Sequence, residues 1–401
     1  MMFSNIDEAI NWICSKRKNY SYEHFKQIAH LKGDIQNGFY TIHVAGTDGK
    51  GSFVSYLCDL LMSQGYKVGT FTSPHYVTHL DRIRINKENI SAQFFLDSLN
   101  RNYDFFTENG LSMFEMDYLI MAEYFHAEKV DFAIIETGIG GRFDSTNVVE
   151  DTALSVITTI GYDHMDRLGN TLAEICFEKC GIIKDNSMVL IGKLPPDCVN
   201  IVREQADAHH SQLYILDDYV QTAQRHFRYH DHEYELSSYA SYQFHNASLA
   251  LQALELISRD RHFEIDYDRA KNALRVSNWP CRFEIVRENP RVILDGAHNI
   301  HGINTLVESF DQFKGSKCIV FSALKRKEYE KMINVLKEHC DELFITSFDY
   351  DGSIDPADFK DYRTFSDYKE AIDEAIRNYD NILICGSLYF MSDVVLNYKF
   401  N

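Results

Sequence analysis

The sequence has no apolar run long enough to cross a lipid bilayer, and its N-terminal stretch, Met1–Asn11, is acidic and lacks the apolar block of a secretory signal. It also has no excess of positive charge: 40 lysine and arginine residues stand against 59 aspartate and glutamate residues, so the formal net charge is -19 at pH 7. Broad binding to nucleic acid or to anionic membranes requires a positive surface, and the charge argues against both. We expect a cytoplasmic protein with neither partner, in which an anionic substrate needs a local basic site.

Disulfide and zinc-finger patterns are missing as well. The nine cysteines are odd in number and contain no Cys-x-x-Cys pair, which fits a reducing compartment better than a disulfide framework. Cys176 and Cys180 lie one helical turn apart, but two thiols without companion ligands are more often core residues. What remains is an ordinary globular composition, 45% hydrophobic and 25% charged, over 401 residues, a length that predicts two domains.

The most informative stretch is Tyr40–Ser52, which reads as a buried strand, a glycine-rich loop and the start of a helix. The glycines that allow the backbone to approach an anion closely are Gly46, Gly49 and Gly51. The helix predicted over Gly51–Gln64 points its positive N-terminus at that anion, Lys50 adds a full charge, and Ser52 offers a hydroxyl for magnesium. The pattern predicts a phosphate-binding loop.

This loop matches the commonest nucleoside-triphosphate loop only in part. That loop has a longer stretch between its first glycine and its Gly-Lys pair, whereas only Thr47 and Asp48 stand there in this chain. A glycine-rich turn that merely joins a strand to a helix therefore remains the alternative interpretation.

From Tyr40 onward, short apolar runs alternate with longer helical patterns, which predicts βαβ units around mostly parallel sheets. The strands and the helix predicted in this way are Val130–Glu136, Ala153–Thr159, the helix near Phe244–Ser258, Arg291–Leu294, Cys318–Phe321, Leu343–Ser347 and Ile382–Cys385. Pro280 marks a break between the two series. We predict an α/β fold: a larger N-terminal P-loop domain with a mostly parallel sheet, residues 1–278, and a smaller C-terminal α/β domain of Rossmann-like type, residues 279–401.

Polar motifs follow the predicted strands, where ligands of α/β proteins usually bind. Glu136 ends a strand beside the glycine turn Gly138–Gly141. A lone glutamate there is usually a surface charge, but with a phosphate loop in the same sheet we favour a magnesium ligand, because Mg²⁺ prefers carboxylate and phosphate oxygens. Thr72–His75 and Asp81–Asn86 follow another strand and fit either an anion clamp or a solvated loop.

Two further residues are ambiguous on residue type alone. His164 follows the next strand and is either a metal ligand on the same rim or a hydrogen-bonded structural residue. Lys179 stands near the end of the helix after it, where a lysine usually complements the negative C-terminus of a helix.

Taken together and in this order, these motifs closely resemble those of the folylpolyglutamate synthase and dihydrofolate synthase family, a branch of the ATP-dependent Mur-type ligases. The matching segments run almost to the C-terminus and are His43–Ser52, Thr72–His75, Glu136–Asn147, Asp163–Gly169, Glu178–Lys184, Asn278–Glu284, Asp295–Asn299 and Gly386–Phe390.

The resemblance implies a role for individual residues. Those at ATP-contacting positions are Gly46, Thr47, Gly49, Lys50, Gly51, Ser52, Asn246, Arg282 and Asp295. Those at magnesium-binding positions are Ser52, Ser73, Glu136 and His164. Those at substrate positions are Phe143, Asp144, Ser145, His298 and Ser387, the last two near the incoming glutamate. Lys179 matches a lysine that the family carbamylates, which replaces its helix-end interpretation; it joins Lys50, Glu136, His164 and His298 as the catalytic set.

The implied reaction is a ligation. ATP phosphorylates a carboxylate of the folate substrate, and the amine of L-glutamate attacks the acyl phosphate to leave an amide. The expected cofactors are ATP and Mg²⁺, the expected substrate is a folate or dihydropteroate, and a monomer is expected. The alternatives are additional dihydrofolate synthase activity, a related ligase acting on another carboxylate, and a nucleotide-binding paralogue that does not ligate.

The chain departs from the family pattern at several positions. Asp48 replaces an asparagine of the loop and adds a negative charge near the phosphates, which should weaken nucleotide binding unless the carboxylate points away or accepts a backbone hydrogen bond. Tyr22–Phe25 stands where many members carry a Gly-Leu-x-Arg-Met element near the pteridine pocket. Cys180, Phe143, Cys281 and Ile300 also differ, but no magnesium-binding position is lost.

Overall fold

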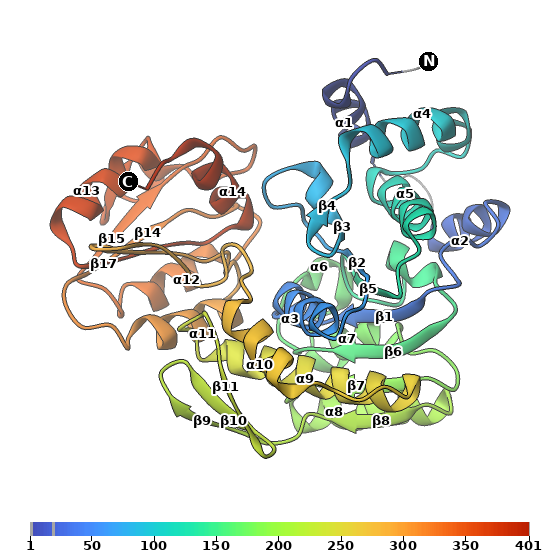
Figure 1. Ribbon diagram of the computed structural model, residues 1–401. Helices are drawn as coiled ribbons and strands as arrows, with labels where there is room; N and C mark the ends of the chain where they lie inside the picture. Colours follow the sequence, from blue (N-terminus) through green and yellow to red (C-terminus); the bar gives the residue numbers. More distant parts are fainter. Residues whose placement is uncertain (1–2, 18–20, 401) are drawn as a thin grey trace. The chain divides into compact units, whose positions relative to one another are not determined.

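The computed structural model describes residues 3–17 and 21–400 and divides into two compact units (Figure 1). The first unit comprises Met1–Asp218 and Asn246–Leu274, and the second comprises Tyr219–His245 and Arg275–Asn401. Met1 and Met2, with which the acidic N-terminal stretch begins, lie outside the described residues. The domain boundary that we predict from the sequence, between residues 278 and 279, stays a proposal. In the structure, residues 219–245 belong to the second unit.

The first unit is built on an eight-stranded sheet with the order β4-β3-β2-β5-β1-β6-β7-β8. Its strands are β1 (Tyr40–Ala45), β2 (Val68–Phe71), β3 (Ile83–Ile85), β4 (Glu88–Asn89), β5 (Phe132–Glu136), β6 (Thr152–Ile157), β7 (Met188–Ile191) and β8 (Gln212–Ile215). The strands from β2 to β8 in this order are parallel, and β3 and β4 form an antiparallel edge. The loops that follow the parallel strands therefore open at one edge of the sheet.

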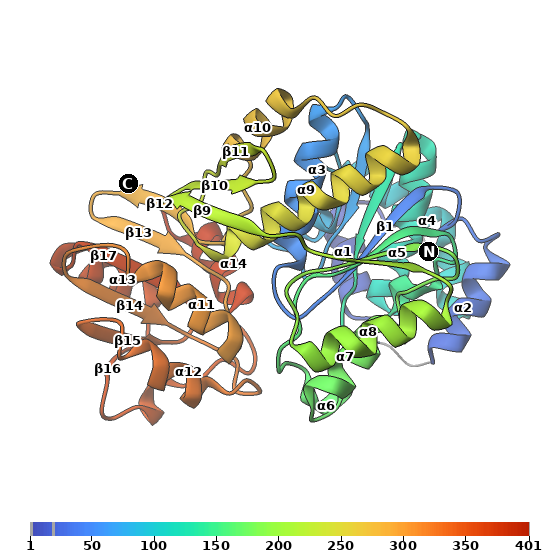
Figure 2. The same ribbon diagram turned by 90° about the horizontal axis from the view of Figure 1, so that it is seen from below.

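The helices of the first unit cover both faces of this sheet. They are α1 (Ile6–Cys14), α2 (Tyr22–Leu31), α3 (Lys50–Ser63), α4 (Ala92–Glu108), α5 (Met113–Glu128), α6 (Met165–Leu168), α7 (Leu172–Cys180) and α8 (Pro196–Ala208), with the 3-10 turns η1 (His79–Arg82) and η2 (Ser145–Val148). The helices α7 and α8 lie on the opposite face from α3 (Figure 2). On the α7 face, α5 packs so closely that a Cβ atom on Gly69 would lie 2.6 Å from the ring of Phe125, so this position requires glycine.

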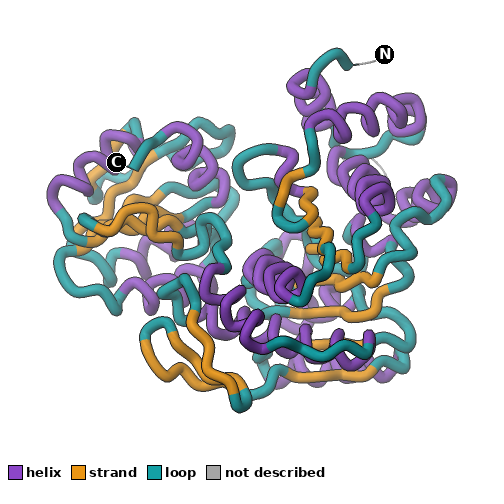
Figure 3. The backbone as a smooth tube through the Cα atoms, in the orientation of Figure 1, coloured by secondary structure: helices purple, strands orange, loops and turns teal. Residues whose placement is uncertain are grey.

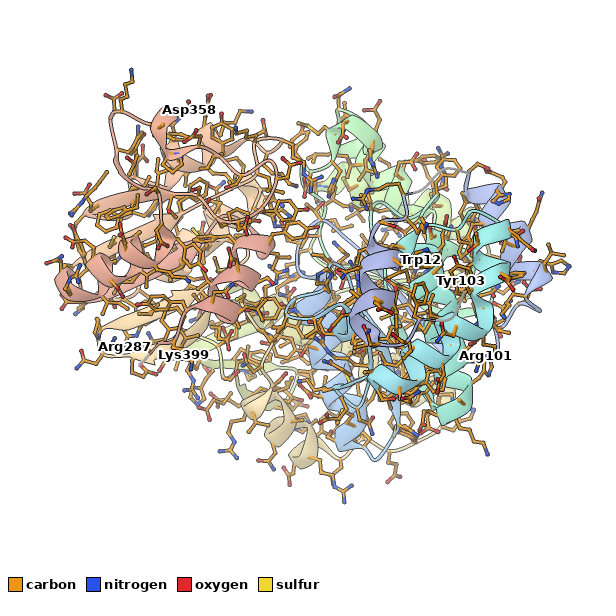
Figure 4. All side chains as sticks on the ribbon, turned by 90° about the horizontal axis from the view of Figure 1, so that it is seen from above. Trp12, Arg101, Tyr103, Arg287, Asp358 and Lys399 are labelled. Carbon is orange, nitrogen blue, oxygen red and sulfur yellow. The ribbon has the colours of Figure 1, made fainter. Side chains whose placement is uncertain are left out.

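The central strands are buried on both faces, which explains their continuous apolar sequence. All residues of β5 are buried, and so are Thr41–Ala45 of β1. The helices α1 and α4 contact each other: Trp12 of α1 and Tyr103 of α4 lie side by side, with ring centroids 5.0 Å apart (Figure 4).

The second unit contains a six-stranded sheet and a small antiparallel sheet (Figure 3). The six strands, in the order β12-β13-β17-β14-β15-β16, are β12 (Glu284–Glu288), β13 (Arg291–Leu294), β17 (Asn381–Cys385), β14 (Lys317–Phe321), β15 (Glu342–Thr346) and β16 (Arg363–Phe365). Only the β12–β13 pair is antiparallel. The small sheet consists of β9 (Tyr219–Ala223), β10 (His226–Tyr229) and β11 (His232–Glu235).

The remaining helices complete the description. The second unit contains α11 (Ile300–Phe310), α12 (Tyr329–Leu336), α13 (Tyr368–Asn378), α14 (Leu388–Asn397) and the 3-10 turn η3 (Pro356–Asp358). The helices α9 (Tyr242–Arg261) and α10 (Tyr267–Val276) each contribute residues to both units. Within the part of the chain that the structure describes, no helix combines the length and apolar character needed to span a membrane.

The predicted α/β class is confirmed, with a mostly parallel sheet in the first unit and a mixed sheet in the second. Each predicted strand is present with ends that differ by up to two residues, and the helix predicted over Gly51–Gln64 is α3. The strands β3, β4, β7, β8, β12 and β16 and the small sheet were not predicted, because strands of two to five residues carry little apolar pattern.

Candidate functional site

The predicted phosphate loop joins β1 to α3. Gly46 has a φ of +154°, and a Cβ atom there would lie 2.0 Å from the hydroxyl oxygen of Thr158. Gly49 caps α3 with a φ of +83°, and a Cβ atom there would lie 2.5 Å from the amide oxygen of Asn246. Only glycine fits both positions, so the loop backbone lies directly against its neighbours. The first backbone N–H groups of α3 follow at once, which is the arrangement that binds phosphate.

Two lysine side chains meet at the carbonyl oxygen of Gly46. Lys50 Nζ donates a hydrogen bond to it over 3.0 Å, and Lys179 Nζ, from the last turn of α7, donates over 2.8 Å. Burial, and then the charge of Lys50, lowers the pKa of Lys179 to about 7. The lysine thus points to the phosphate loop and away from the end of its own helix, and a large share of it is neutral near pH 7.

Threonine hydroxyls hold the phosphate loop from β6. Thr158 Oγ1 donates to the carbonyl oxygen of Asp48 over 2.6 Å, Thr159 Oγ1 donates to the same oxygen over 3.1 Å, and the Asp48 N–H donates to Thr159 Oγ1 over 3.0 Å. The Thr47 hydroxyl is held by the backbone of Gly161 in the same way. These threonines could not be predicted from the sequence, because a hydroxyl on a neighbouring strand has no local pattern of its own.

Glu136 lies at the end of β5, directly beside β1, and is buried. Its Oε2 accepts a hydrogen bond from the backbone N–H of Ser73 over 3.4 Å. The structure thus brings together two of the four residues that we predict to bind magnesium. A third, Ser52, lies in the first turn of α3.

His164, the fourth of these residues, begins α6 with a φ of +51°, and its Nε2 lies 3.8 Å from the carboxylate of Asp163. The charge of that carboxylate raises the pKa of Lys179 against the effect of burial, and those of Asp48 and Asp144 do the same. The loops that carry these three aspartates therefore all contribute negative charge near the buried amine of Lys179.

The donor types fit magnesium. Glu136 offers a buried carboxylate, and Ser52 and Ser73 offer hydroxyl oxygens, the hard ligands that Mg²⁺ prefers; the imidazole of His164 is a less usual ligand. Across residues 3–17 and 21–400, no three histidine, cysteine, aspartate or glutamate side chains gather into a metal-binding group. A magnesium ion here would thus take further ligands from phosphate oxygens and water.

Asp144 shapes the loop that follows β5. Its carboxylate accepts the N–H of Ile139 over 2.8 Å, the N–H of Thr146 over 3.0 Å and the hydroxyl of Thr146 over 2.6 Å. Asp144 and the neighbouring Ser145 are buried. Contacts within the loop therefore occupy much of the hydrogen-bonding capacity that this segment could present to a substrate. Phe143 differs, because half of it is exposed and the guanidinium of Arg142 stacks 4.4 Å from its ring.

The second unit carries the other predicted residues at the carboxyl edge of its sheet. The buried carboxylate of Asp295, after β13, accepts hydrogen bonds from the Tyr242 hydroxyl over 2.7 Å and from the N–H groups of Phe283 and Ala297, each over 2.8 Å. Burial raises the pKa of Asp295, while the charge of Arg282 and these hydrogen bonds oppose that rise. Tyr242 is a partner that the sequence did not indicate.

The three remaining predicted residues lie close to these elements in the same unit. A Cβ atom on Gly296 would lie 3.0 Å from Arg282 Nη1, which places the guanidinium against the Asp295–Ala297 turn. His298 Nδ1 lies 2.9 Å from the carbonyl oxygen of Gly296, so Nδ1 carries the proton and donates it. Ser387 caps α14 directly after β17, the strand next to β13, and its hydroxyl oxygen accepts the N–H of Tyr389.

The chain is similar in sequence to known proteins over most of its length. Residues 44–254 match the Mur ligase middle domain, and residues 281–388 match the Mur ligase glutamate ligase domain. A Bacillus subtilis (strain 168) protein named dihydrofolate synthase/folylpolyglutamate synthase is 36% identical, with 98% of this chain and 99% of the relative covered.

Two solved structures extend the likeness to three dimensions. Escherichia coli FolC in complex with DHPP and ADP has a TM-score of 0.88 at 25% identity, with 98% of this chain and 97% of that chain covered. A bifunctional folylpolyglutamate synthase/dihydrofolate synthase with Mn, AMPPNP and L-glutamate bound has a TM-score of 0.86 at 26% identity, with 98% of each chain covered. The chain belongs to the folylpolyglutamate synthase/dihydrofolate synthase family of Mur ligases and is an ATP-dependent glutamate ligase.

Proposed function

We propose that this chain lengthens the glutamate tail of tetrahydrofolate, as a folylpolyglutamate synthase. The observation that carries the proposal is the meeting of Lys50 and the buried Lys179 at the Gly46 carbonyl, inside a glycine-rich loop at the start of α3. Both amines would there face the phosphates of a bound nucleotide, and the lowered pKa of Lys179 leaves that side chain partly neutral near pH 7.

The reaction proceeds in two displacements. A carboxylate oxygen of the folate attacks the γ-phosphorus of ATP, which forms an acyl phosphate and releases ADP. The amine of L-glutamate then attacks the acyl carbon, so that an amide bond forms and inorganic phosphate and a proton leave. Lys50 and the backbone N–H groups of α3 stabilise the negative charge on the phosphoryl oxygens.

Magnesium supplies further neutralisation of the phosphoryl charge when bound. We propose Ser52, Ser73, Glu136 and His164 as the residues that hold it. For the nucleotide we propose Gly46, Thr47, Gly49, Lys50, Gly51, Ser52, Asn246, Arg282 and Asp295. For the substrates we propose Phe143, Asp144, Ser145, His298 and Ser387. The close approach of Asn246 to Gly49 supports its place at the loop.

Dihydrofolate synthase activity is a second candidate, because the relative that is 36% identical carries both names. Purified protein assayed for glutamate-dependent ADP release with tetrahydrofolate, dihydropteroate and a murein precursor separates the possibilities. We expect turnover with tetrahydrofolate, and turnover with dihydropteroate would add the second activity. If neither tetrahydrofolate nor dihydropteroate supports ADP release, the proposal is disproved.

We also propose that the protein is a monomer, which size-exclusion chromatography with light scattering tests.

The Asp48→Asn variant is expected to bind ATP more tightly than the natural chain. The negative charge of Asp48 acts on Lys179 in the phosphate loop and repels phosphate oxygens in the same way. The threonine hydrogen bonds go to the backbone of Asp48, so they can form equally well in the variant. At about 1 kcal/mol for such a like-charge interaction, KM for ATP should fall by about fivefold.

The matched control for this variant is Asp207→Asn, which makes the same change of net charge at an exposed position of α8. Steady-state kinetics with varied ATP should show no change in the control. A rise of KM for ATP in Asp48→Asn would mean that the carboxylate supports the loop.

A further inference from the structure

The loop that follows β2, residues 72–82, covers a buried cluster of charged side chains: His79, Arg82 and Asp117. The side chain of Asp117, on α5, is 0% exposed, and those of His79 and Arg82 are 2% and 6% exposed. None of the steps proposed above uses His79 or Asp117.

One carboxylate in this cluster serves two cations. His79 Nε2 donates a hydrogen bond to Asp117 Oδ1 over 2.8 Å. Arg82 Nε lies 3.7 Å from Asp117 Oδ2, too far for a hydrogen bond, and neither of these two atoms has another partner within residues 3–17 and 21–400. Arg82 also donates from Nη2 to Nδ1 of His75 over 3.2 Å. A continuous path thus runs from Asp117 through Arg82 to His75.

The buried cluster has one more positive than negative charge. Burial alone would lower the pKa of His79, but the charge and hydrogen bond of Asp117 and a contact with Cys14 raise it to about 9, against the charge of Arg82. His79 and Arg82 are therefore both charged at neutral pH, with Asp117 as their shared counter-ion. An uncompensated charge is costly to bury, and an anion placed against the cluster would relieve that cost.

A second carboxylate does not supply this anion. Asp81 accepts the backbone N–H groups of Tyr76, Val77 and Thr78 and lies 3.7 Å from Arg84, so it fixes the course of the loop and has its own cation. The base of the loop is closed by the Thr72 N–H, which donates to the carbonyl oxygen of Arg82 over 2.9 Å.

The N-terminal helices brace the other side of the buried cluster. His79 Nδ1 lies 3.5 Å from Cys14 Sγ of α1, and its ring meets the ring of Phe95 of α4 edge-on at 5.7 Å. The Trp12–Tyr103 contact holds α1 and α4 together (Figure 4). The charged groups are thus fixed in position by α1, α4 and α5 before any ligand binds.

We propose that Asp117 and His79 are positioning residues for the folate substrate: they hold Arg82, and through it His75, so that the 72–82 loop offers a fixed positive site to a substrate carboxylate. The inference rests on the proposed function, which requires such a carboxylate to come close to the metal site. The loop is suitably placed, because its second residue is Ser73, whose N–H contacts Glu136. Within the loop, His75 is the partly exposed end of the path and Arg82 is the buried end.

The test compares Asp117→Asn and His79→Gln with the control Glu123→Gln. Glu123 is a carboxylate of the same helix that is paired with Arg101 and Lys32, away from the loop. We expect Asp117→Asn to raise KM for tetrahydrofolate by about tenfold, as expected for a lost charged hydrogen bond, and to change KM for ATP by less than about twofold. The Asp117→Asn/His79→Gln double variant should lose no more than the worse single variant, because both act through Arg82.

A structural role alone predicts a different pattern. Asp117→Asn, His79→Gln and Glu123→Gln would then lower the melting temperature and leave KM for tetrahydrofolate unchanged, or KM for both substrates would rise together; either result overturns the inference. If Asp117→Asn does not fold, His79→Gln and Arg82→Lys carry the same comparison, since the lysine keeps the charge and loses the guanidinium geometry.

Two further arms identify the carboxylate and separate the inference from the function. If the variants lose equally with tetrahydrofolate and dihydropteroate, the site holds the carboxylate that reacts. If they lose with tetrahydrofolate alone, it holds the carboxylate of the glutamyl part that does not react. Both results support the site. A natural chain without pterin-dependent ADP release overturns the function itself. An active natural chain whose variants keep their KM overturns only the role of Asp117 and His79.

Discussion

Replacing Lys179 by alanine is expected to lower kcat by about 10²–10³-fold, the loss typical of removing one preorganised group from a catalytic site. The lysine is buried and donates directly to the Gly46 carbonyl at the centre of the phosphate loop. Its removal also leaves the loop carbonyl with only Lys50 as a donor among the contacts described above. Single-turnover measurement of ADP formation, compared with ATP binding, shows whether the loss lies in the chemical step.

We further expect Lys179 to work as its carbamate. The neutral amine attacks CO₂, which forms a new N–C bond and releases a proton, so the reaction needs the deprotonated lysine that a pKa of about 7 supplies. When Lys179 is protonated, it is a second cation beside Lys50 at one carbonyl oxygen. The carbamate replaces this repulsion by attraction, which favours the modification.

The dependence on CO₂ and pH follows with a defined sign. Enzyme stripped of CO₂ at pH 6, where Lys179 is mostly protonated, should lose activity, and bicarbonate should restore it faster at pH 8 than at pH 6. Activity after timed addition of bicarbonate measures the rate, and a ¹³C NMR signal from labelled bicarbonate identifies the carbamate.

Lys184 provides the matched control for this prediction. It lies on the segment after α7, is largely buried with a pKa lowered to about 8, and donates to the Asn147 carbonyl instead of the phosphate loop. Whatever activity a Lys184→Gln variant retains should still respond to CO₂, whereas a Lys179→Ala variant should not respond. Full activity of CO₂-free enzyme with unmodified Lys179 would rule out the carbamate.

The strands, the phosphate loop and the position of Glu136 could be predicted because their signals are local. Gly46 and Gly49 stand at fixed places between an apolar strand and a helix, and the structure shows that a Cβ atom has no room at either. Glu136 follows directly from the end of a buried strand. In each case the sequence neighbours are also the physical neighbours.

The partners that shape these groups lie far away in the sequence and could not be predicted. Lys179 meets Gly46 across 133 residues, and His79 meets Asp117 across 38. Thr158 and Thr159 look like ordinary strand residues until the parallel pairing of β1 with β6 brings them to Asp48. Their roles depend on the sheet order, which no pattern of side chains within one segment specifies.

Glu136→Gln is expected to lower kcat by about 10²–10³-fold and to raise the magnesium concentration required for half-maximal rate. The amide keeps the shape of the side chain and its carbonyl oxygen can still accept the Ser73 N–H, so the fold should persist. What is lost is the buried negative charge, which a hard divalent cation requires from at least one ligand in this set of hydroxyls and imidazole. Titration of the initial rate with MgCl₂ measures the change.

Glu115→Gln is the control that separates charge at the metal site from burial of a carboxylate. Glu115 is buried like Glu136, but its Oε2 accepts the N–H and the hydroxyl of Ser112 in the capping box of α5. Its replacement should reduce the free energy of unfolding by about 1 kcal/mol and leave the magnesium requirement unchanged. Equal shifts of the magnesium midpoint in both variants would show that the ion does not depend on Glu136, and the ligand set would then have to be sought among the other loops after the parallel strands.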